Sequence, residues 1–352
     1  MRPFIKFIFC FIAINLCNQL LQAQSNSSGS ALQILDSGLI SSNAPFESCH
    51  ASTLVELPGK KIMAAWFGGK HEGSGDVAIW MAVNEKGKWN KPKEIANGLQ
   101  TDGARLACWN PVLYRTRNGL LFLHYKVGSS PRGWWAVVKS SADNGNTWSP
   151  ARKLPNGFLG PIKNKPIQLK NGDILYPSSI ESENDNTWRV HLEKSDSIGN
   201  NWQRIEIDCD SFNVIQPTLL QYSGDTLQML CRSRQNVIAE SWSYDEGIHW
   251  EKMSAGSLPN PNSGIDAVSL GNGKHLLVYN PLLAGKDWWM GRSVLKIAVS
   301  LNGHEWQDML TLENHTEGEY SYPAIIQSKD GEIHITYTYD RKNIKYIRCK
   351  LN

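Results

Sequence analysis

The sequence predicts an all-β chain that closes into a six-bladed β-propeller, because two repeats of about fifty residues run through it out of phase. The first repeat is a turn motif, Ser-x-Asp-x-Gly-x-Thr-Trp, which occupies residues 141–148 and returns at 243–250 with His249 in place of the threonine. Looser copies end at Trp89, Trp202 and Trp306, so successive copies lie 48–59 residues apart. The second repeat is a short apolar strand, a glycine turn and an alternating strand, and it occurs six times.

The chain begins with a segment that is predicted to be a signal peptide. A basic start and an apolar run end at Ala23, and the run is too short and interrupted to span a membrane. We expect residues 1–23 to be removed on export, residues 24–44 to form a short N-terminal segment, and residues 45–352 to form one propeller domain. The mature protein is expected to be secreted or periplasmic, without stable membrane insertion.

Each strand repeat predicts the innermost strand of one blade, and each turn motif predicts an outer hairpin turn. The six apolar segments are 52–55, 111–113, 166–169, 217–220, 267–270 and 323–326. In the turn motif, Asp accepts local backbone hydrogen bonds, Gly supplies a positive φ, and Trp fills the space between neighbouring sheets. These motifs are therefore assigned to the scaffold. Because five such turns serve six units, the last blade is predicted to combine strands from both ends of the chain.

Charge and cysteine content exclude several classes of function. The 352 residues carry 36 Lys and Arg against 33 Asp and Glu, so no basic field points to nucleic acid. Five cysteines follow the signal peptide at wide spacings, which argues against a disulfide framework or a zinc site. If one bridge forms, Cys49 and Cys108 are the first pair to examine. Since no phosphate-binding loop or metal-ligand spacing occurs, no cofactor or metal is expected.

The residues just before the innermost strands are polar and large, and a propeller brings them together at one mouth of its central channel. They are His50, Asn110, Lys163, Lys165, Gln216, Asp266, Tyr320 and Tyr322. Ordinary hairpin turns use Gly, Ser, Asn or Asp at such places. The pattern therefore predicts a binding site for a small, hydroxyl-rich ligand, and a merely solvated channel mouth is the alternative.

Arginines follow the second strands and set the expected charge of the ligand. Arg232, Arg234 and Arg292 make cations more numerous than carboxylates around the predicted mouth. Because an arginine can bind a carboxylate with two parallel hydrogen bonds, an acidic sugar is the favoured ligand. The glycine-rich loop after the first unit carries a candidate general acid, Asp76 or Glu72.

Together these residues resemble the sialidase (neuraminidase) superfamily with BNR or Asp-box repeats, over nearly the whole mature chain. The resemblance implies that Arg232 and Arg292 correspond to two of the three arginines that bind the substrate carboxylate in that family. It also implies that Glu319 and Tyr320 belong to the nucleophile segment, and that Asp76 lies in the loop of the general acid.

Two positions depart from the family's pattern. His50 stands where the first arginine belongs, and Gln216 stands where a glutamate polarises the tyrosine hydroxyl. A tyrosine whose pKa is near 10 is otherwise a poor nucleophile, and a glutamine cannot take its proton. Glu319 or Glu181 would have to substitute for that glutamate.

The leading functional prediction is an exported, exo-acting glycoside hydrolase that removes an acidic sugar from the end of a glycan or polysaccharide. Asp76 is expected to protonate the leaving oxygen, and Tyr320, with Glu319 beside it, to act at the anomeric carbon. The residues expected to bind the sugar are His50, Asn110, Lys165, Gln216, Arg232, Arg234 and Arg292.

Two alternatives remain open on the sequence. A uronate-specific polysaccharide lyase needs only a charge-neutralising cation and a base, for which His50, Lys165 and Tyr320 are candidates. A glycan-binding propeller without catalysis is the other alternative, and Gln216 favours it. In all three cases the expected partner is a glycan.

Overall fold

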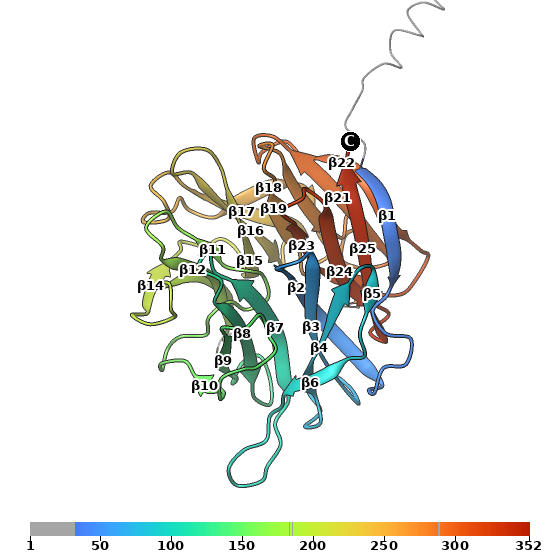
Figure 1. Ribbon diagram of the computed structural model, residues 1–352. Helices are drawn as coiled ribbons and strands as arrows, with labels where there is room; N and C mark the ends of the chain where they lie inside the picture. Colours follow the sequence, from blue (N-terminus) through green and yellow to red (C-terminus); the bar gives the residue numbers. More distant parts are fainter. Residues whose placement is uncertain (1–31, 183, 185, 288) are drawn as a thin grey trace, which may run out of the picture.

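The structure is a ring of six β-sheets, and every regular element among the described residues is a strand (Figure 1). The computed structural model describes residues 32–182, 184, 186–287 and 289–352, so the predicted signal peptide lies outside the described residues. The described residues include no helix that is long and apolar enough to cross a membrane. The six sheets confirm the predicted six-bladed propeller.

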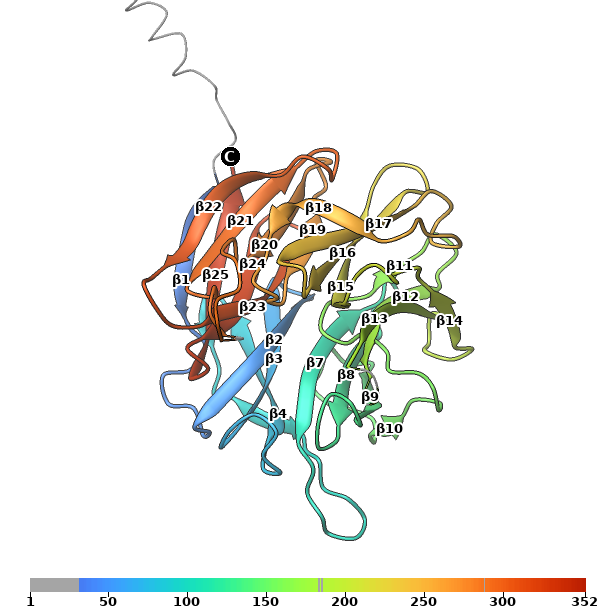
Figure 2. The same cartoon turned by 180° about the vertical axis from the view of Figure 1, so that it is seen from behind.

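Each blade is an antiparallel sheet that begins at the centre of the ring, and the two opposite views show the blades following one another around it (Figures 1 and 2). Blade 1 contains β2 (Ser48–Leu57), β3 (Lys61–Gly69), β4 (Ala78–Glu85), β5 (Lys88–Trp89) and β6 (Lys93–Ala96). Blade 2 contains β7 (Cys108–Arg115), β8 (Leu121–Val127), β9 (Trp135–Ser141) and β10 (Arg152–Lys153). Blade 3 contains β11 (Ile167–Gln168), β12 (Ile174–Glu181), β13 (Trp188–Ser195) and β14 (Gln203–Glu206).

The remaining blades follow the same order. Blade 4 contains β15 (Val214–Gln221), β16 (Leu227–Ser233), β17 (Val237–Ser243) and β18 (Ser254–Pro259). Blade 5 contains β19 (Asp266–Ser269), β20 (His275–Tyr279), β21 (Val294–Ser300) and β22 (Gln307–Asn314). Blade 6 contains β23 (Tyr320–Gln327), β24 (Ile333–Tyr339), β25 (Asn343–Leu351) and β1 (Leu32–Leu39).

The ring is closed by both ends of the chain, as predicted. β1 pairs antiparallel with β25, from Leu32 opposite Leu351 to Leu39 opposite Lys345. In blade 6, the outermost strand, β1, therefore comes from the N-terminal part of the chain, and the other three strands come from its C-terminal part. The propeller therefore starts at Leu32 and not at residue 45, so part of the expected N-terminal segment belongs to blade 6.

The turn motifs act as scaffold. The Asp143 carboxylate accepts hydrogen bonds from the Thr147 backbone N–H at 2.9 Å and from the Thr147 hydroxyl at 2.6 Å, while Gly145 has a φ of +86°. Asp245 accepts a backbone hydrogen bond from His249 in the same way, at 2.9 Å. These hydrogen bonds lower the pKa of both aspartates to about 2. In three copies the tryptophan N–H donates to the glycine carbonyl of its own motif at 2.8–3.1 Å.

Apolar side chains fill the space between neighbouring blades. Between blades 1 and 2 the packed residues include Phe67, Leu113 and Leu121, all nearly inaccessible to solvent. Cys108 is buried in this cluster, Cys49 is buried in the cluster between blades 1 and 6, and both are free rather than bridged. Burial raises the pKa of both thiols to about 12, which keeps them protonated and unreactive at neutral pH.

Candidate functional site

The innermost strands of four blades share a backbone irregularity at the mouth of the central channel. Each of β2, β7, β15 and β23 contains a bulge, and the residues there with left-handed φ, between 36° and 55°, are Ala51, Asn110, Gln216 and Tyr322. Glutamine and tyrosine rarely adopt this conformation, and such strain is concentrated at functional sites. The recurrence of the bulge around the ring marks this mouth as the candidate site.

Tyr322 lies at the centre of the site. Its hydroxyl oxygen accepts a hydrogen bond from Arg232 Nη1 at 2.6 Å and a longer one from Gln216 Nε2 at 3.4 Å. The His50 ring lies against the Tyr322 ring with 4.1 Å between centroids, and the Lys163 ammonium lies 5.8 Å from the Tyr322 ring centroid. The hydroxyl is thus held by two N–H donors, and basic groups surround the ring.

Arg232 and Arg292 lie beside this tyrosine, with 5.6 and 5.9 Å from each guanidinium carbon to the Tyr322 ring centroid, and Arg341 is linked to Arg292 through Glu319. Arg232 lies in β16, Arg292 lies before β21, and Arg341 lies in the turn between β24 and β25. Arg232 donates to the Asn262 side-chain oxygen at 2.9 Å and to the Asn262 carbonyl, and Arg292 donates to that same carbonyl at 3.2 Å. Asn262 therefore joins two of the guanidinium groups.

Glu319 joins the second pair of arginines. Its carboxylate accepts hydrogen bonds from Arg292 Nη1 at 2.9 Å and from Arg341 Nε at 2.6 Å. Burial alone would raise the pKa of Glu319, but the charges and hydrogen bonds of Arg341 and Arg292 outweigh it and hold that pKa well below its usual range. Glu319 is thus a permanent carboxylate, and its geometry makes it a counter-ion rather than a general base.

His50 is a neutral imidazole in the floor of the site. Burial, reinforced by the charge of Arg341, lowers the pKa of His50 well below its usual range. Its Nδ1 atom is 2.8 Å from the Thr338 hydroxyl, which also accepts the Ala51 backbone N–H at 3.3 Å. His50 therefore does not supply the positive charge of the arginine whose place it takes.

The structure places Tyr320 apart from the arginines. Its hydroxyl donates to Asp340 Oδ2 at 3.4 Å, its ring stacks on His315 with 4.2 Å between centroids, and burial raises its pKa to about 12. The bulge between Ser321 and Ala324 breaks the two-residue alternation of β23, so the two tyrosines do not share an environment. The tyrosine among the arginines is Tyr322.

The loop between β3 and β4 approaches the site through Glu72, which forms an ion pair with Arg341. Asp76, the expected general acid, accepts a hydrogen bond from the Lys70 backbone N–H at 3.0 Å within that loop. A hydrogen bond from the Ser74 side chain is the main cause of a lowered pKa at Asp76. Asp76 also lines a pocket of about 350 Å³ together with Phe46 and Trp80.

Of the remaining predicted residues of the centre, Lys163 and Asn110 are buried and Lys165 is partly buried. Lys165 Nζ contacts both carboxylate oxygens of Asp266 at 2.9 Å, so its charge is neutralised. Lys163 donates to the Pro323 carbonyl at 2.6 Å, next to Tyr322, and burial lowers its pKa to about 7. Asn110 is buried at the equivalent bulge of blade 2.

Arg234 lies on one side of the mouth. Its guanidinium carbon is 4.0 Å from the Trp188 ring centroid, while that of Arg232 is 5.5 Å from the same centroid. Burial raises the pKa of Glu181, which lies close to both arginines, although their charges oppose the shift. Arg234 therefore belongs to the rim of the site and Arg232 to its centre.

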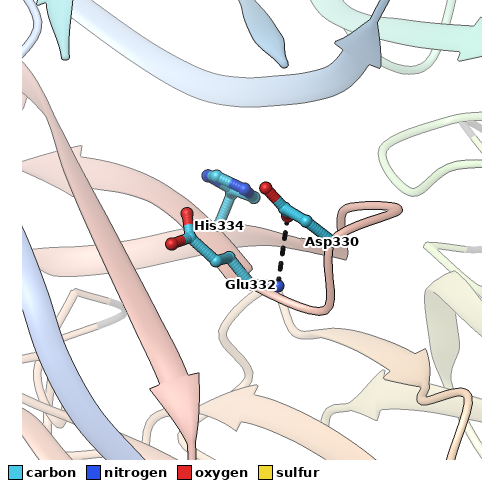
Figure 3. Close-up of side chains that lie close together, drawn as sticks. All are labelled: Asp330, Glu332 and His334. Atoms are coloured by element: carbon cyan, nitrogen blue, oxygen red, sulfur yellow. Dashed lines mark hydrogen bonds between the residues drawn. The ribbon is translucent and has the colours of Figure 1, made fainter. Parts of the chain in front are cut away.

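A group of potential metal ligands lies elsewhere, in blade 6. Asp330, Glu332 and His334 bring their ligand atoms within 4.8 Å of one another (Figure 3). Asp330 forms an ion pair with Lys60 at 3.0 Å, and Glu332 forms one with Arg348 at 3.1 Å. The two His334 ring nitrogens contact the Tyr346 and Ser328 hydroxyls at 2.8 and 3.0 Å. Because protein cations and hydroxyls already satisfy these groups, they do not form a favourable metal site.

Sequence reasoning did not assign roles to three residues that the structure brings into the centre. Asn262 and Arg341 come from loops outside both repeats, and no sequence signal singled them out. The sequence does contain an indication for Tyr322, because Tyr322-Pro323 occupies the same position in the second repeat as Asn110-Pro111 and Gln216-Pro217. That alignment of the second repeat selects Tyr322 over Tyr320.

Comparisons with known proteins agree with this architecture. A family model described as a BNR repeat-like domain matches residues 60–335, and no curated protein matches the chain. A protein of unknown function from Dyadobacter fermentans aligns with a TM-score of 0.74 and 13% identity, over 92% of this chain and 100% of that chain.

Sialidases are also among the similar structures. The intramolecular trans-sialidase of Ruminococcus gnavus aligns with a TM-score of 0.68 and 14% identity, over 90% of this chain and 98% of that chain. A sialidase from Streptococcus pneumoniae aligns with a TM-score of 0.67 and 11% identity, over 94% of this chain and 73% of that chain. At these identities the likeness establishes a shared sialidase-like propeller fold.

Proposed function

This chain belongs to the BNR repeat-like domain family, and we propose that it is an exo-acting glycoside hydrolase that removes an acidic sugar from the end of a glycan. The observation that carries the proposal is the Tyr322 hydroxyl, held at 2.6 Å by Arg232 among arginines from three blades. A positioned oxygen nucleophile beside groups that bind carboxylates suits glycosyl transfer from an acidic sugar.

The substrate carboxylate is proposed to bind to Arg232 and Arg292. In the free protein both guanidinium groups donate to Asn262, whose amide and carbonyl oxygens are neutral acceptors. A carboxylate forms shorter and stronger hydrogen bonds with guanidinium groups than an amide does, so it can replace these contacts. Glu319 keeps Arg292 in place while this exchange occurs.

The Tyr322 oxygen is proposed to bond to the anomeric carbon as the glycosidic bond breaks, with its hydroxyl proton passing to solvent and Asp76 protonating the leaving oxygen; water then cleaves the bond between Tyr322 and the sugar. Because hydrogen bonds from Ser74 and Lys70 lower the pKa of Asp76, the free protein holds this group ionised at neutral pH. Because an ordinary aspartate, with a pKa of about 3.9, is also ionised at neutral pH, Asp76 can act as an acid only if substrate binding breaks these hydrogen bonds and also raises its pKa by burial or by a nearby negative charge. The ion pair of Glu72 with Arg341 ties the loop that carries Asp76 to the centre.

Replacing Gln216 with glutamate is expected to raise the turnover number. Gln216 lies 3.4 Å from the Tyr322 hydroxyl and can only donate to it through Nε2, whereas a carboxylate accepts the hydroxyl proton. A correctly placed base makes the expected rise about tenfold or more, measured as sugar released per unit time. Gln221→Glu, an exposed change on the same strand, is the matched control. Equal rates in Gln216→Glu and wild type would show that the Tyr322 proton does not limit the reaction.

A lyase is the second candidate, and the contact between His50 and Tyr322 favours it. A neutral imidazole, a tyrosine and neighbouring arginines supply the base and the charge neutralisation that elimination from a uronate requires. Such a reaction needs no carboxylate beside Tyr322, so Gln216 is compatible with it.

One experiment tests these functions together. The purified mature protein is incubated with a fluorogenic sialoside and with acidic polysaccharides of plant, algal and animal origin. Released reducing sugar without new ultraviolet absorbance supports hydrolysis, whereas absorbance of an unsaturated uronate supports the lyase. Saturable binding without either product would contradict both enzyme functions and leave a glycan-binding propeller.

The protein is also proposed to act outside the cytoplasm, on the basis of the predicted signal peptide. Export predicts that the mature chain begins after Ala23, which N-terminal sequencing of the protein from its native host measures. A mature chain that retains residues 1–23 would contradict it.

A further inference from the structure

A row of cationic side chains leads from the centre of the site to its rim. Arg232 lies in β16, and Arg234 is the first residue after the end of that strand. The Trp188 ring lies beside both guanidinium groups, at 5.5 Å and 4.0 Å. The row therefore begins at Tyr322, which Arg232 contacts, and runs outward over an aromatic surface.

At the outer end of the row, two guanidinium groups share one acceptor. Arg234 Nη1 donates to the Asn186 carbonyl at 2.8 Å, and Arg234 Nη2 donates to Asn186 Oδ1 at 3.1 Å. Arg132 Nη2 donates to the same Oδ1 atom at 3.1 Å. Two like charges held on one neutral oxygen repel each other, and a bound anion would relieve that repulsion.

The charges around this pair leave it positive. Burial and the nearby Arg132 charge lower the pKa of Arg234, while the Glu181 carboxylate opposes that shift. The electrostatic neighbours of Glu181 include Arg132, Arg232 and Arg234, so one carboxylate faces three guanidinium groups. A second anion can therefore bind here without displacing Glu181.

We propose that Arg132, Arg234 and Trp188 form a second anion subsite, which binds the carboxylate or sulfate of the sugar next to the terminal one. This inference rests on the proposed function, because it takes the central site as the position of the terminal acidic sugar. The guanidinium forks provide the geometry that planar and tetrahedral oxyanions require, and the indole face can stack on a sugar ring. The substrate is thus a polyanionic glycan with acid groups on neighbouring sugars.

The test measures binding of acidic disaccharides to the full mature chain by titration calorimetry, in a Tyr322→Phe background that prevents turnover. One ligand carries an acid group on the terminal sugar alone, and two others carry a uronate or a sulfate on the second sugar as well. Arg132→Ala with Arg234→Ala is expected to weaken binding of the doubly charged ligands about 10- to 100-fold, since charge-assisted hydrogen bonds are lost.

The same double variant is expected to leave the affinity for the singly charged ligand within about twofold, because the central contacts remain. Glu181→Gln is expected to strengthen binding of the doubly charged ligands, since it removes a competing negative charge. The charge-matched control is Lys170→Ala with Arg204→Ala, which removes two cations from exposed ion pairs with Asp225 and Glu206.

Equal weakening for singly and doubly charged ligands would overturn the subsite while leaving the proposed function standing. Weakened binding in Glu181→Gln would also overturn it, because the sign of the effect would not be electrostatic. If the arginine double variant weakens binding of the doubly charged ligands alone, the subsite is supported. If the wild-type protein at the same time releases no sugar, the hydrolase function is contradicted while the subsite stands. Comparing the affinities of the ligand with a uronate on the second sugar and the ligand with a sulfate there shows which anion the subsite prefers.

Discussion

Replacing Tyr322 with phenylalanine is expected to abolish turnover and leave the fold intact. The change removes one oxygen atom, which accepts hydrogen bonds from Arg232 and Gln216 and is the proposed nucleophile. Loss of a nucleophile lowers the turnover number by about a thousandfold or more. The ring keeps its contact with His50, so the thermal midpoint is expected to change little. The measurement is sugar release at saturating substrate, together with thermal unfolding.

Tyr320→Phe is the matched control, because it removes the same atom two positions earlier. The Tyr320 hydroxyl contacts Asp340 and lies outside the arginine group, so its loss is expected to change turnover less than about tenfold. If Tyr320→Phe were inactive and Tyr322→Phe retained full activity, the assignment of the nucleophile to Tyr322 would be wrong.

Removing the Glu319 carboxylate is expected to have the largest effect on stability. Its side chain is only 12% exposed and forms ion pairs with Arg292 and Arg341, which are 3% and 22% exposed. Glu319→Ala removes the carboxylate that the two guanidinium groups share, although Arg341 keeps its ion pair with Glu72, and the expected loss is about 3–5 kcal/mol in the free energy of unfolding. Urea denaturation at neutral pH measures this change.

Glu85→Ala is the control, since it breaks an exposed ion pair with Lys61. That pair is 55% and 39% exposed, so its loss is expected to lower the free energy of unfolding by less than about 1 kcal/mol. Comparable losses in the two variants would show that the Glu319 ion pairs do not stabilise the centre.

The free energy of unfolding is also expected to depend on pH through the Glu319 carboxylate. Because the folded protein holds the pKa of Glu319 well below its value in the unfolded chain, the stabilisation is present above the unfolded pKa of about 4.3. It is lost as pH falls below that value and the carboxylate is protonated. Glu319→Gln is therefore expected to flatten the fall in the free energy of unfolding below about pH 5. An unchanged slope would contradict the assigned pKa shift.

The fold could be predicted because its determinants are local and repeated. The Asp143 and Asp245 turns each satisfy their own backbone within five residues, so the same short motif marks every copy. The count of five turns for six strand repeats also predicted the closure by both termini, which the pairing of β1 with β25 confirms. The boundary at residue 45 was less accurate, because β1 carries neither motif.

The site could be predicted only in part, because its geometry depends on contacts between distant loops. Arg232 and Gln216 follow repeat positions, and the structure brings both to Tyr322. Asn262 and Arg341 lie in loops, so only the closed ring places them beside the other arginines. The choice between the two tyrosines depends on a bulge in β23, and a single sequence shows bulges poorly.

The most direct test of the account is to follow the reaction in water enriched in heavy oxygen, with mass spectrometry of the released sugar. Hydrolysis centred on Tyr322 predicts one heavy oxygen atom at the anomeric carbon of the sugar released by the wild type. It predicts no such product from the Tyr322→Phe variant. Release of an unsaturated sugar without heavy oxygen, or equal incorporation by the variant and the wild type, would contradict it.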